Sequence, residues 1–428
     1  MEYRNSLLFA KEQDKKDPLK NFRKKFLLPK YKGNDALYFL GNSLGLQPAS
    51  VGKYIKAELS RWAKLASEGH FEGHNPWYSY HEMFAKPVAK LVGTLESEVI
   101  VMNQLTVNLH LLMVSFYKPK GKRYKIICES NAFSSDNYAL QTQVQMHGYN
   151  PSDAIIEVSP RKGEHTLRTE DIEHAINSNA DEIALVFFGG VNYLTGQLLD
   201  MPRITKVAHK AGIVCGFDLA HAVGNVELNL HKWNVDFAAW CTYKYFNSGP
   251  GSVAGAYIHQ KYVKNPELLR LGGWWGYDKK TRFAMHKKFV PMQTAEGWQL
   301  SNAPIFLMAA HKASIDIFME AGGMAPLRKK SLQLTAYLEF IIHEINKKVK
   351  NKKIQLEIIT SSDPAQRGCQ LSIIAHGLGK DFHKALTKAG VFCDWRNPNV
   401  IRLAPVPLYN SFEDVYRFGQ VAEKLLLK

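Results

Sequence analysis

Residues 214–246, VCGFDLAHAVGNVELNLHKWNVDFAAWCTYKYF, form the stretch that decides the expected fold. One apolar run ends at Asp218, a turn carrying His221 follows, and a second apolar run leads to Lys244. In open α/β sheets, ligands bind at the carboxyl ends of the strands. A carboxylate and an amine at two such ends therefore predict a cofactor site.

Strand-like and helix-like segments alternate on both sides of this stretch, between residues 98 and 259. Apolar runs such as YKIICE (124–129) and EIALVFFGG (182–190) alternate with helical patterns such as TEDIEHAINS (169–178). This alternation predicts βαβ units and a mostly parallel sheet with helices on both faces. The short apolar runs are typical of interior parallel strands.

The pattern changes after residue 302, where two long helical patterns precede alternating strands and helices. A chain of 428 residues also suggests two domains. We expect a small α+β domain at 303–428 and a large cofactor-binding domain at 61–302. Residues 1–60 are expected to form an N-terminal arm and part of the small domain, since the first forty are polar and basic with little periodicity.

The formal net charge of +16 raises nucleic acid or an anionic membrane as partners. The basic residues, however, gather in KEQDKKDPLKNFRKKF (11–26) and KKVKNKK (347–353), which is typical of solvated faces. The 46% apolar and 22% charged content is that of an ordinary globular protein. We therefore expect neither a nucleic-acid partner nor a membrane partner.

Cysteine usage and the N-terminus point to the cytoplasm. The five cysteines are scattered and odd in number, which fits a reducing compartment rather than a disulfide framework. The apolar part of MEYRNSLLFAKEQ is too short for a signal peptide. His70 and His74 flank F-E-G in a loop without further clustered ligands, so no metal site is predicted.

A pyridoxal phosphate site requires a lysine, a carboxylate for the pyridine nitrogen, a stacking aromatic, a phosphate-binding helix start and a substrate-binding arginine. Lys244 follows an apolar run, so it lies either at the solvent-exposed surface or in a binding site of low dielectric. Asp218 alone is equally consistent with an Asx turn. Asp218-x-x-His221 followed by a lysine after the next strand, however, is a pattern of fold-type I pyridoxal enzymes.

The other requirements also have candidates. Thr106 opens a helix, where it is either an N-cap or part of a phosphate site. Phe133 suits ring stacking or an ordinary core, and Asp136 could simply cap a helix. Arg402 lies between apolar neighbours and needs a buried partner, such as a substrate carboxylate. No nucleotide-binding glycine loop, H-E-x-x-H or G-x-S-x-G motif competes.

Several specific stretches resemble the kynureninase family: YFLGNSLGLQP (38–48), MNQLTVNLHLLMVSFYKP (102–119), FDLAHAVGNVELNLHKWNVDFAAWCTYKY (217–245), GGWWG (272–276), QLSNAP (299–304) and NPNVIRLAPVPLYNSF (397–412). The resemblance runs from about Tyr38 to the C-terminus. It implies a fold-type I pyridoxal phosphate homodimer with active sites at the subunit interface. The implied activity is hydrolysis of kynurenine or 3-hydroxykynurenine to L-alanine and anthranilate or 3-hydroxyanthranilate, in tryptophan catabolism and NAD biosynthesis.

The resemblance also implies roles for individual residues. The implied catalytic residues are Lys244, which bonds covalently to the cofactor, Asp218 and Tyr243. The implied cofactor contacts are Leu105, Thr106, Phe133, Ser134, Ser135, Asp136, Asp218, His221, Tyr243, Lys244, Trp274 and Asn302. The implied substrate contacts are Ser43, His70, Asn302 and Arg402. Trp274 and Ser301–Asn302 would reach a cofactor across the dimer interface.

Two positions depart from the family pattern. Ser134 stands where proline usually follows the stacking phenylalanine, and Gly189 stands where many members carry a hydroxyl residue. His70 and Asn302 resemble members that favour 3-hydroxykynurenine, so we expect that preference. A cysteine desulfurase or aminotransferase shares the Asp–Lys arrangement, and a nucleic-acid-binding protein would account for the charge; both alternatives stay open at this point.

Overall fold

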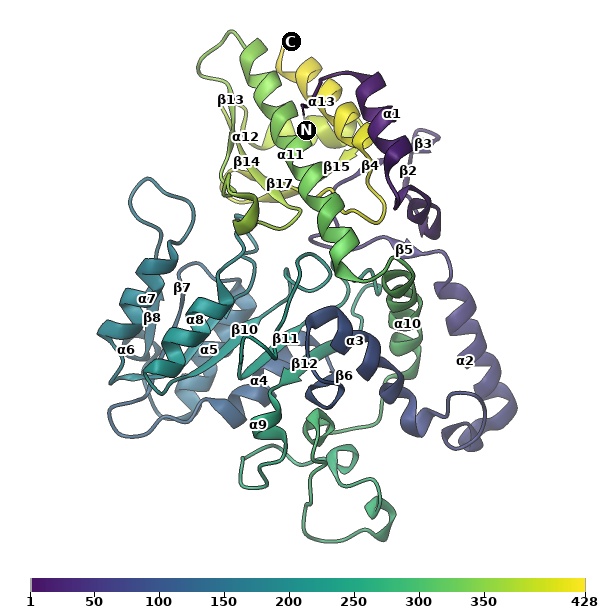
Figure 1. Ribbon diagram of the computed structural model, residues 1–428, viewed down its shortest axis with the longest axis vertical. Coiled ribbons are helices and arrows are strands. Elements are labelled where there is room, and N and C mark those ends of the chain that lie inside the picture. The colour runs from purple at the N-terminus through teal and green to yellow at the C-terminus, as the bar shows by residue number, and fades with distance from the viewer. Residues whose placement is uncertain (1, 428) are drawn as a thin grey trace.

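The computed structural model describes residues 2–427 and is built on a seven-stranded sheet (Figure 1). The strand order is β6-β12-β11-β10-β9-β7-β8. The strands are β6 (Val99–Met102), β7 (Lys125–Glu129), β8 (Ile155–Val158), β9 (Ile183–Gly189), β10 (Val214–Asp218), β11 (Phe237–Trp240) and β12 (Ala254–Ile258). The pairs from β8 to β11 are parallel, and only β12 runs antiparallel to its neighbours β11 and β6. The predicted mostly parallel sheet is confirmed.

Helices cover both faces of this sheet, which explains its uninterrupted apolar strands. Alternate residues of β9 belong to different cores: Leu185 and Phe187 pack in one cluster, Val186 and Phe188 in the other. One core includes α4 (Leu105–Phe116) and α5 (Ser134–Met146), and the opposite core includes α7 (Thr169–Ser178) and α8 (Met201–Lys210). Burial of both faces favours parallel strands without polar alternation. Short helices α6 (Pro151–Ala154) and α9 (Gln260–Val263) complete this part.

A second, antiparallel sheet has the order β13-β14-β17-β16. Its strands are β13 (Gln355–Ile358), β14 (Leu371–His376), β16 (Asp394–Arg396) and β17 (Val400–Leu403). They share a core with α11 (Met324–Lys348), α12 (Gly379–Lys388) and α13 (Phe412–Leu426). This unit lies at the upper end of the molecule in Figure 1. β15 (Val391–Phe392) pairs with β4 (Leu37–Tyr38) and so joins the N-terminal segment to it.

The N-terminal segment is more regular than the sequence predicted. Residues 7–16 form helix α1 (Leu7–Lys16), capped by Ser6 and lying beside α13 (Figure 1). Asp14 accepts the N–H groups of Phe412 and Glu413 at 2.7 and 3.0 Å, which caps the start of α13. Helix α1 was not predicted from the sequence, because this contact is tertiary and leaves little periodicity.

The segment around the loop predicted to carry His70 and His74 is also partly helical. It contains two 3₁₀ helices, η2 (Ala66–His70) and η3 (Trp77–Phe84), before α3 (Ala85–Val92). Trp77 Nε1 and Tyr80 OH donate to the buried Glu58 carboxylate of α2 (Val51–Leu65) at 2.8 and 3.1 Å. Helix α2 packs in turn against α10 (Ile305–Glu320). The remaining short elements are β1 (Phe26–Leu27), β2 (Lys30–Tyr31), β3 (Asn34–Asp35), β5 (Gln47–Pro48), η1 (Lys20–Lys25), η4 (Glu96–Glu98), η5 (Trp274–Gly276), η6 (Arg282–Ala284), η7 (Ala295–Trp298) and η8 (Pro364–Gln366).

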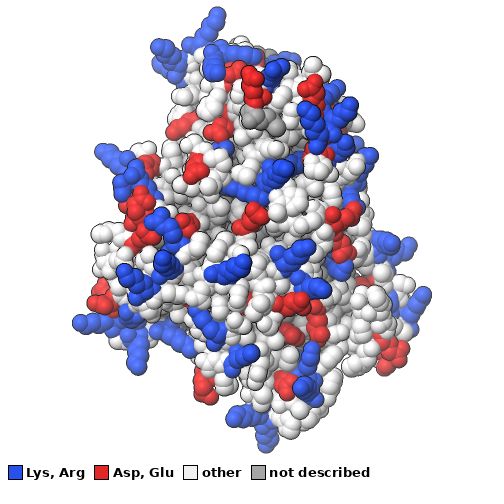
Figure 2. Space-filling view, viewed as in Figure 1, with Lys and Arg blue, Asp and Glu red and all other residues white. Residues whose placement is uncertain are grey.

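Positive charge is dispersed over the face of the molecule drawn in Figure 2. On the face in Figure 2, Lys and Arg side chains are spread over the molecule with Asp and Glu between them. Such interspersed charge is the pattern expected of a solvated surface. No helix between residues 2 and 427 combines the length and apolarity that a bilayer span requires.

Candidate active site

A pocket lies where the carboxyl ends of β7, β9 and β10 face the starts of α4 and α5. Its lining residues are Gln104, Leu105, Thr106, Glu129, Phe133, Ser135, Asp136, Gly189, Val191, Tyr193, Asp218, Ala220, His221, Tyr243 and Lys244. Nine of them are residues for which the sequence predicted cofactor contacts: Leu105, Thr106, Phe133, Ser135, Asp136, Asp218, His221, Tyr243 and Lys244.

Lys244 and Asp218 reach this pocket from adjacent strands. Lys244 lies in the turn after β11, with Nζ 5.9 Å from the ring centroids of both Phe133 and Tyr243. Asp218 is the last residue of β10, and its Oδ1 accepts the Ala220 N–H at 2.6 Å. The Phe133 ring is 43% exposed at the other side of the pocket, which leaves its face free to stack on a ligand.

Three buried carboxyl groups, those of Asp218, Asp136 and Glu129, lie together at the pocket. Burial raises the pKa of Asp218, although the Lys244 ammonium and the Ala220 N–H oppose that rise. Burial and the neighbouring Asp218 raise the pKa of Asp136 strongly. Burial raises the pKa of Glu129 to about 7. A pocket with this much desolvated acid favours a cationic ligand group, such as the protonated nitrogen of a pyridine ring.

The starts of α4 and α5 provide the donors that a phosphate requires. No side chain from residues 2–427 caps the first turn of α4, which leaves its N–H groups available. Thr106 Oγ1 and Ser135 Oγ, one from each helix start, lie 2.7 Å apart at the pocket. A helix N-terminus of this kind binds an anion through its N–H groups and dipole. These helix starts fit the phosphate of pyridoxal phosphate, and the buried carboxyl groups fit its pyridine nitrogen.

His221 and Tyr243 are held in their neutral forms. Burial and the Lys244 charge lower the pKa of His221 well below its usual value. His221 Nδ1 is buried and has no hydrogen-bond partner in the described part of the chain, so it can serve a ligand. Burial, with Cys241 next in importance, raises the pKa of the Tyr243 phenol. Tyr243 therefore keeps its proton at neutral pH.

The turn around Ser43 docks on the lysine segment. The Gly45 N–H donates to the Tyr243 carbonyl at 2.8 Å. A Cβ at position 45 would collide with the Lys244 carbonyl and with Asn247, so only glycine permits this close approach. Ser43 thus lies two residues from a direct contact with the lysine segment, although it is not part of the pocket wall.

Arg402 lies behind the pocket wall and contacts it through Tyr193. It is 1% exposed on β17, and its Nη1 donates to the Tyr193 carbonyl at 2.7 Å. Its Nη2 forms an ion pair with Asp394. The Tyr193 ring meets the Phe133 ring edge-on, with centroids 5.3 Å apart. Burial lowers the pKa of Arg402 to about 10, so it remains charged.

Three predicted site residues lie away from this pocket. His70, Trp274 and Asn302, together with Ser301, line a second pocket near the loops between α9 and α10. They do not line the pocket that contains Lys244. Ser134 lies between the pocket residues Phe133 and Ser135, but its own side chain is exposed and does not line the pocket.

Glu129 and Tyr193 are among the pocket residues that were not predicted from the sequence. Glu129 ends the apolar run YKIICE at the same sheet edge as Asp218, and that position was a usable signal. Its carboxylate occupies the space beside Gly189: a Cβ at 189 would lie 2.7 Å from Glu129 Oε1. Tyr193 comes from an irregular loop without a recognisable pattern.

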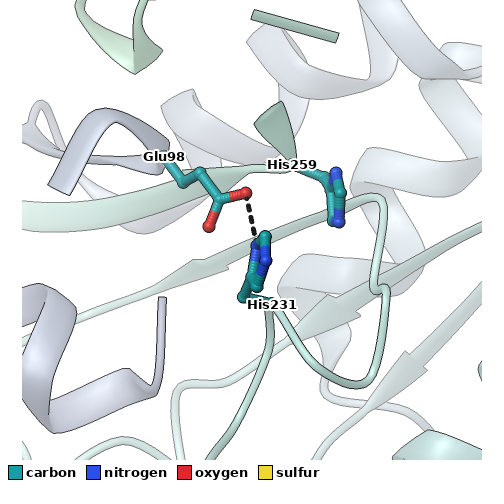
Figure 3. Close-up of side chains that lie close together, drawn as sticks. All are labelled: Glu98, His231 and His259. Atoms are coloured by element: carbon teal, nitrogen blue, oxygen red, sulfur yellow. Dashed lines mark hydrogen bonds and ion pairs between the residues drawn. The ribbon is translucent and has the colours of Figure 1, made fainter. Parts of the chain in front are cut away.

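A separate cluster of Glu98, His231 and His259 lies near the opposite edge of the sheet (Figure 3). His231 Nδ1 lies 2.9 Å from Glu98 Oε1, which also accepts the Gln260 N–H at 2.8 Å. The two imidazole rings stack with an interplanar angle of 11°. One ligand atom from each of the three residues lies within 4.8 Å of the others.

Comparisons with known proteins agree with this arrangement. Residues 327–422 match the family model described as the kynureninase C-terminal domain, and residues 67–232 match that of the DegT/DnrJ/EryC1/StrS aminotransferase family. A kynureninase from Flavobacterium psychrophilum is 54% identical over 100% of both chains. The Homo sapiens kynureninase is 48% identical over 96% of this chain and 91% of its own.

Solved structures of lower sequence identity share the fold. A cysteine desulfurase from Thermococcus onnurineus superimposes with a TM-score of 0.74 at 18% identity, over 95% of this chain and 98% of its own. One from Escherichia coli also reaches 0.74, at 15% identity, over 95% and 99% of the two chains. The fold is that of the fold-type I pyridoxal phosphate enzymes. Within that class, the chain belongs to the kynureninase family.

Proposed function

We propose that this chain is a kynureninase, a hydrolase that cleaves the Cβ–Cγ bond of kynurenine or 3-hydroxykynurenine to L-alanine and an aryl acid. The observation that carries the proposal is the shared pocket of Lys244 and Asp218, in a chain that is 54% identical over its full length to a kynureninase. The pathway is then tryptophan catabolism and the synthesis of pyridine nucleotides.

Pyridoxal phosphate, when bound, supplies an electron sink that stabilises negative charge on carbons of the attached amino acid. In our proposal, Leu105, Thr106 and Ser135 hold its phosphate, and Phe133 supports its ring. Asp218 keeps the ring nitrogen protonated, with His221 and Asp136 beside it. The desolvated carboxyl groups around Asp218 support this assignment.

Lys244 would hold pyridoxal phosphate through its amine, and it is proposed to carry the proton removed from the substrate Cα. Tyr243 is proposed as the acid that donates a proton in the later steps, after water has added to the γ-carbonyl. The raised pKa of Tyr243 supports this role because the phenol holds its proton until a stronger base develops. Arg402 is proposed to hold the substrate α-carboxylate, with Ser43 close to the same end of the site.

We propose that the enzyme is a homodimer in which the second pocket completes the site of the partner subunit. Four apolar side chains are exposed near that pocket: Phe71, Trp274, Phe283 and Met285, at 58%, 44%, 57% and 72% exposure. Trp274 and Phe71 both contact Phe283, so these side chains form a contiguous patch of the kind that marks interfaces. His70, Trp274 and Asn302 would then reach the neighbouring cofactor and substrate.

The proposed substrate preference is 3-hydroxykynurenine. His70 and Asn302 line the same pocket, so an imidazole and an amide are available together to hydrogen-bond a ring hydroxyl. Comparing kcat/KM for the two substrates tests this preference, and a clear bias toward kynurenine would refute it.

Other pyridoxal enzymes share the fold, so product analysis is the decisive test of the activity. The protein loaded with pyridoxal phosphate is mixed with 3-hydroxykynurenine or kynurenine, and L-alanine and aryl acid are quantified. Equal amounts of both products are expected. Release of sulfide from cysteine, or transfer of the substrate amino group to a keto acid, without alanine would assign the chain to a cysteine desulfurase or an aminotransferase.

We further propose that the enzyme works in the cytoplasm, since its five cysteines are free and buried in the described chain. The division into an N-terminal segment (1–60), a large cofactor-binding domain (61–302) and a small domain (303–428) is likewise a proposal. Limited proteolysis of the loaded enzyme, with mapping of the first cleavage sites, tests these boundaries.

A further inference from the structure

Glu129 is a buried carboxylate at the end of β7 that holds the neighbouring strand and loop. Its Oε1 accepts the Gly189 N–H at 3.2 Å, and its Oε2 accepts Asn192 Nδ2 at 2.7 Å. Both donors belong to the chain that leaves β9 and passes along the pocket. Glu129 is 5% exposed, so water does not replace these contacts easily.

Asn192 passes this constraint to the bridge loop, which we define as residues 191–197. Its Oδ1 accepts the Leu194 and Thr195 N–H groups at 3.0 and 2.9 Å. The loop then contacts the antiparallel sheet: the Leu194 carbonyl accepts Ser372 Oγ at 2.5 Å. The bridge loop is therefore fixed on one side by Glu129 and on the other by Ser372 of the antiparallel sheet.

Arg402 receives one of its two protein contacts from this loop. Its Nη1 donates to the Tyr193 carbonyl at 2.7 Å, while Nη2 pairs with Asp394 on the adjacent strand β16. Its buried Nε has no hydrogen-bond partner among residues 2–427. These contacts use two of the five guanidinium N–H groups, so others, including the Nε–H, remain for an incoming carboxylate. The direction of the guanidinium depends on the Tyr193 carbonyl and on Asp394.

We propose that Glu129 is a positioning residue for Arg402: through Asn192 and the bridge loop it fixes the carbonyl that orients the guanidinium toward the substrate α-carboxylate. This inference rests on the proposed substrate-binding role of Arg402. Glu129→Gln is the first test, because an amide can accept only one of the two N–H groups and turns its own donor toward the other. The bridge loop is then released while the volume of the side chain is kept.

The expected result is a split between substrate binding and turnover. The KM of the loaded Glu129→Gln enzyme rises about tenfold, as expected for one lost hydrogen bond to a charged group, whereas kcat changes less than about threefold. Titration with L-alanine, which carries the α-carboxylate but no aryl group, is followed by the visible absorbance of the bound cofactor. Its dissociation constant rises by the same factor, while the inhibition constant of anthranilate stays constant.

Asn192→Ala breaks the same chain of contacts one step later and should reproduce the rise in KM, which keeps the test valid if Glu129→Gln folds poorly. Glu157→Gln, an exposed acid on the adjacent strand β8, is the matched control and should leave KM unchanged. In an Arg402→Lys background, Glu129→Gln should have no further effect on KM, because both changes remove the same contact.

The outcomes separate this inference from the function on which it rests. If Arg402→Lys raises KM but Glu129→Gln and Asn192→Ala do not, the positioning role of Glu129 is overturned and Arg402 keeps its role. Additive effects of Glu129→Gln and Arg402→Lys, or a loss confined to kcat, overturn it as well. If Arg402→Lys leaves KM unchanged, the proposed role of Arg402 is overturned together with this inference.

Discussion

Gly189 donates its N–H to Glu129 Oε1 at 3.2 Å, and a Cβ on Gly189 would lie 2.7 Å from that same oxygen. The absence of a side chain at Gly189 therefore leaves the space that the buried Glu129 carboxylate occupies. Gly189 is also the register partner of Asp218 on the neighbouring strand, so the feature borders the proposed cofactor site directly.

Gly189→Ala should destabilise the protein by about 1–3 kcal/mol, because the added methyl group displaces a hydrogen-bonded carboxylate in a packed region. Urea unfolding measures the change. Glu129→Ala vacates the space, so the double variant should lose less than the sum of the two single losses. Gly52→Ala, where no atom lies within 4 Å of the added Cβ, is the control and should cause no loss. Strict additivity of Gly189→Ala and Glu129→Ala would contradict the contact.

Asp218→Asn should lower kcat about 100-fold or more, because the neutral amide no longer stabilises a protonated ring nitrogen in a buried site. Cofactor content, measured by absorbance after gel filtration, should fall much less, since the phosphate and ring contacts remain. Turnover close to that of the unaltered enzyme would show that Asp218 does not face the ring nitrogen.

Asp17→Asn tests the attachment of the N-terminal segment. The Asp17–Lys330 ion pair is 2.8 Å long with both side chains buried, and Lys330 also donates to the Pro407 carbonyl. Removing the carboxylate leaves a buried ammonium unpaired, which should cost about 3 kcal/mol in urea unfolding. Glu320→Gln, which removes the exposed pair with Lys25, should cost less than about 1 kcal/mol. Equal losses from the two variants would argue against a buried pair.

We expect the free energy of unfolding to fall in acid because of the buried His311. It is fully buried on α10, its Nδ1 pairs with Ser248 Oγ at 2.7 Å, and burial lowers its pKa from 6.5 to about 3. Between these values the unfolded chain binds a proton that the folded chain does not, so stability falls as pH falls. The contribution at pH 4.5 is about 3 kcal/mol relative to pH 7.

His311→Gln removes this titration. Unfolding free energies of both proteins are compared from pH 7 to pH 4.5, with cofactor saturating throughout. From pH 7 to pH 4.5, the unfolding free energy of the unaltered protein should fall by about 3 kcal/mol more than that of His311→Gln. A difference that is independent of pH would mean that His311 is not held neutral in the folded protein.

The sequence allowed the sheet and the central pair of residues to be predicted, because both depend on local patterns. Asp218 and Lys244 each follow an apolar run, and parallel strands bring such ends together. The fold class was confirmed for the same reason. The role of Tyr193 could not be predicted, since its contribution is a backbone carbonyl, which every residue type carries. Helix α1 was missed because contacts with α13 stabilise it, and those contacts lie about 400 residues away along the chain.

The pocket of His70, Trp274 and Asn302 illustrates a different limit. The family resemblance implied that Trp274 and Asn302 reach a cofactor across a dimer interface, and the chain gathers them with His70 around a second cavity. Residues that serve the site of another subunit carry the same sequence signal as residues that serve their own. Only the assembled oligomer distinguishes the two.

Lys244→Ala is the measurement that tests the central claim most directly. After loading with pyridoxal phosphate, dialysis and addition of 3-hydroxykynurenine, the unaltered enzyme should retain visible absorbance and release L-alanine. Lys232→Ala, at an exposed lysine in the same region, should behave identically. Lys244→Ala should lose both the characteristic absorbance and alanine release. Alanine release at an unchanged rate by Lys244→Ala would contradict the account.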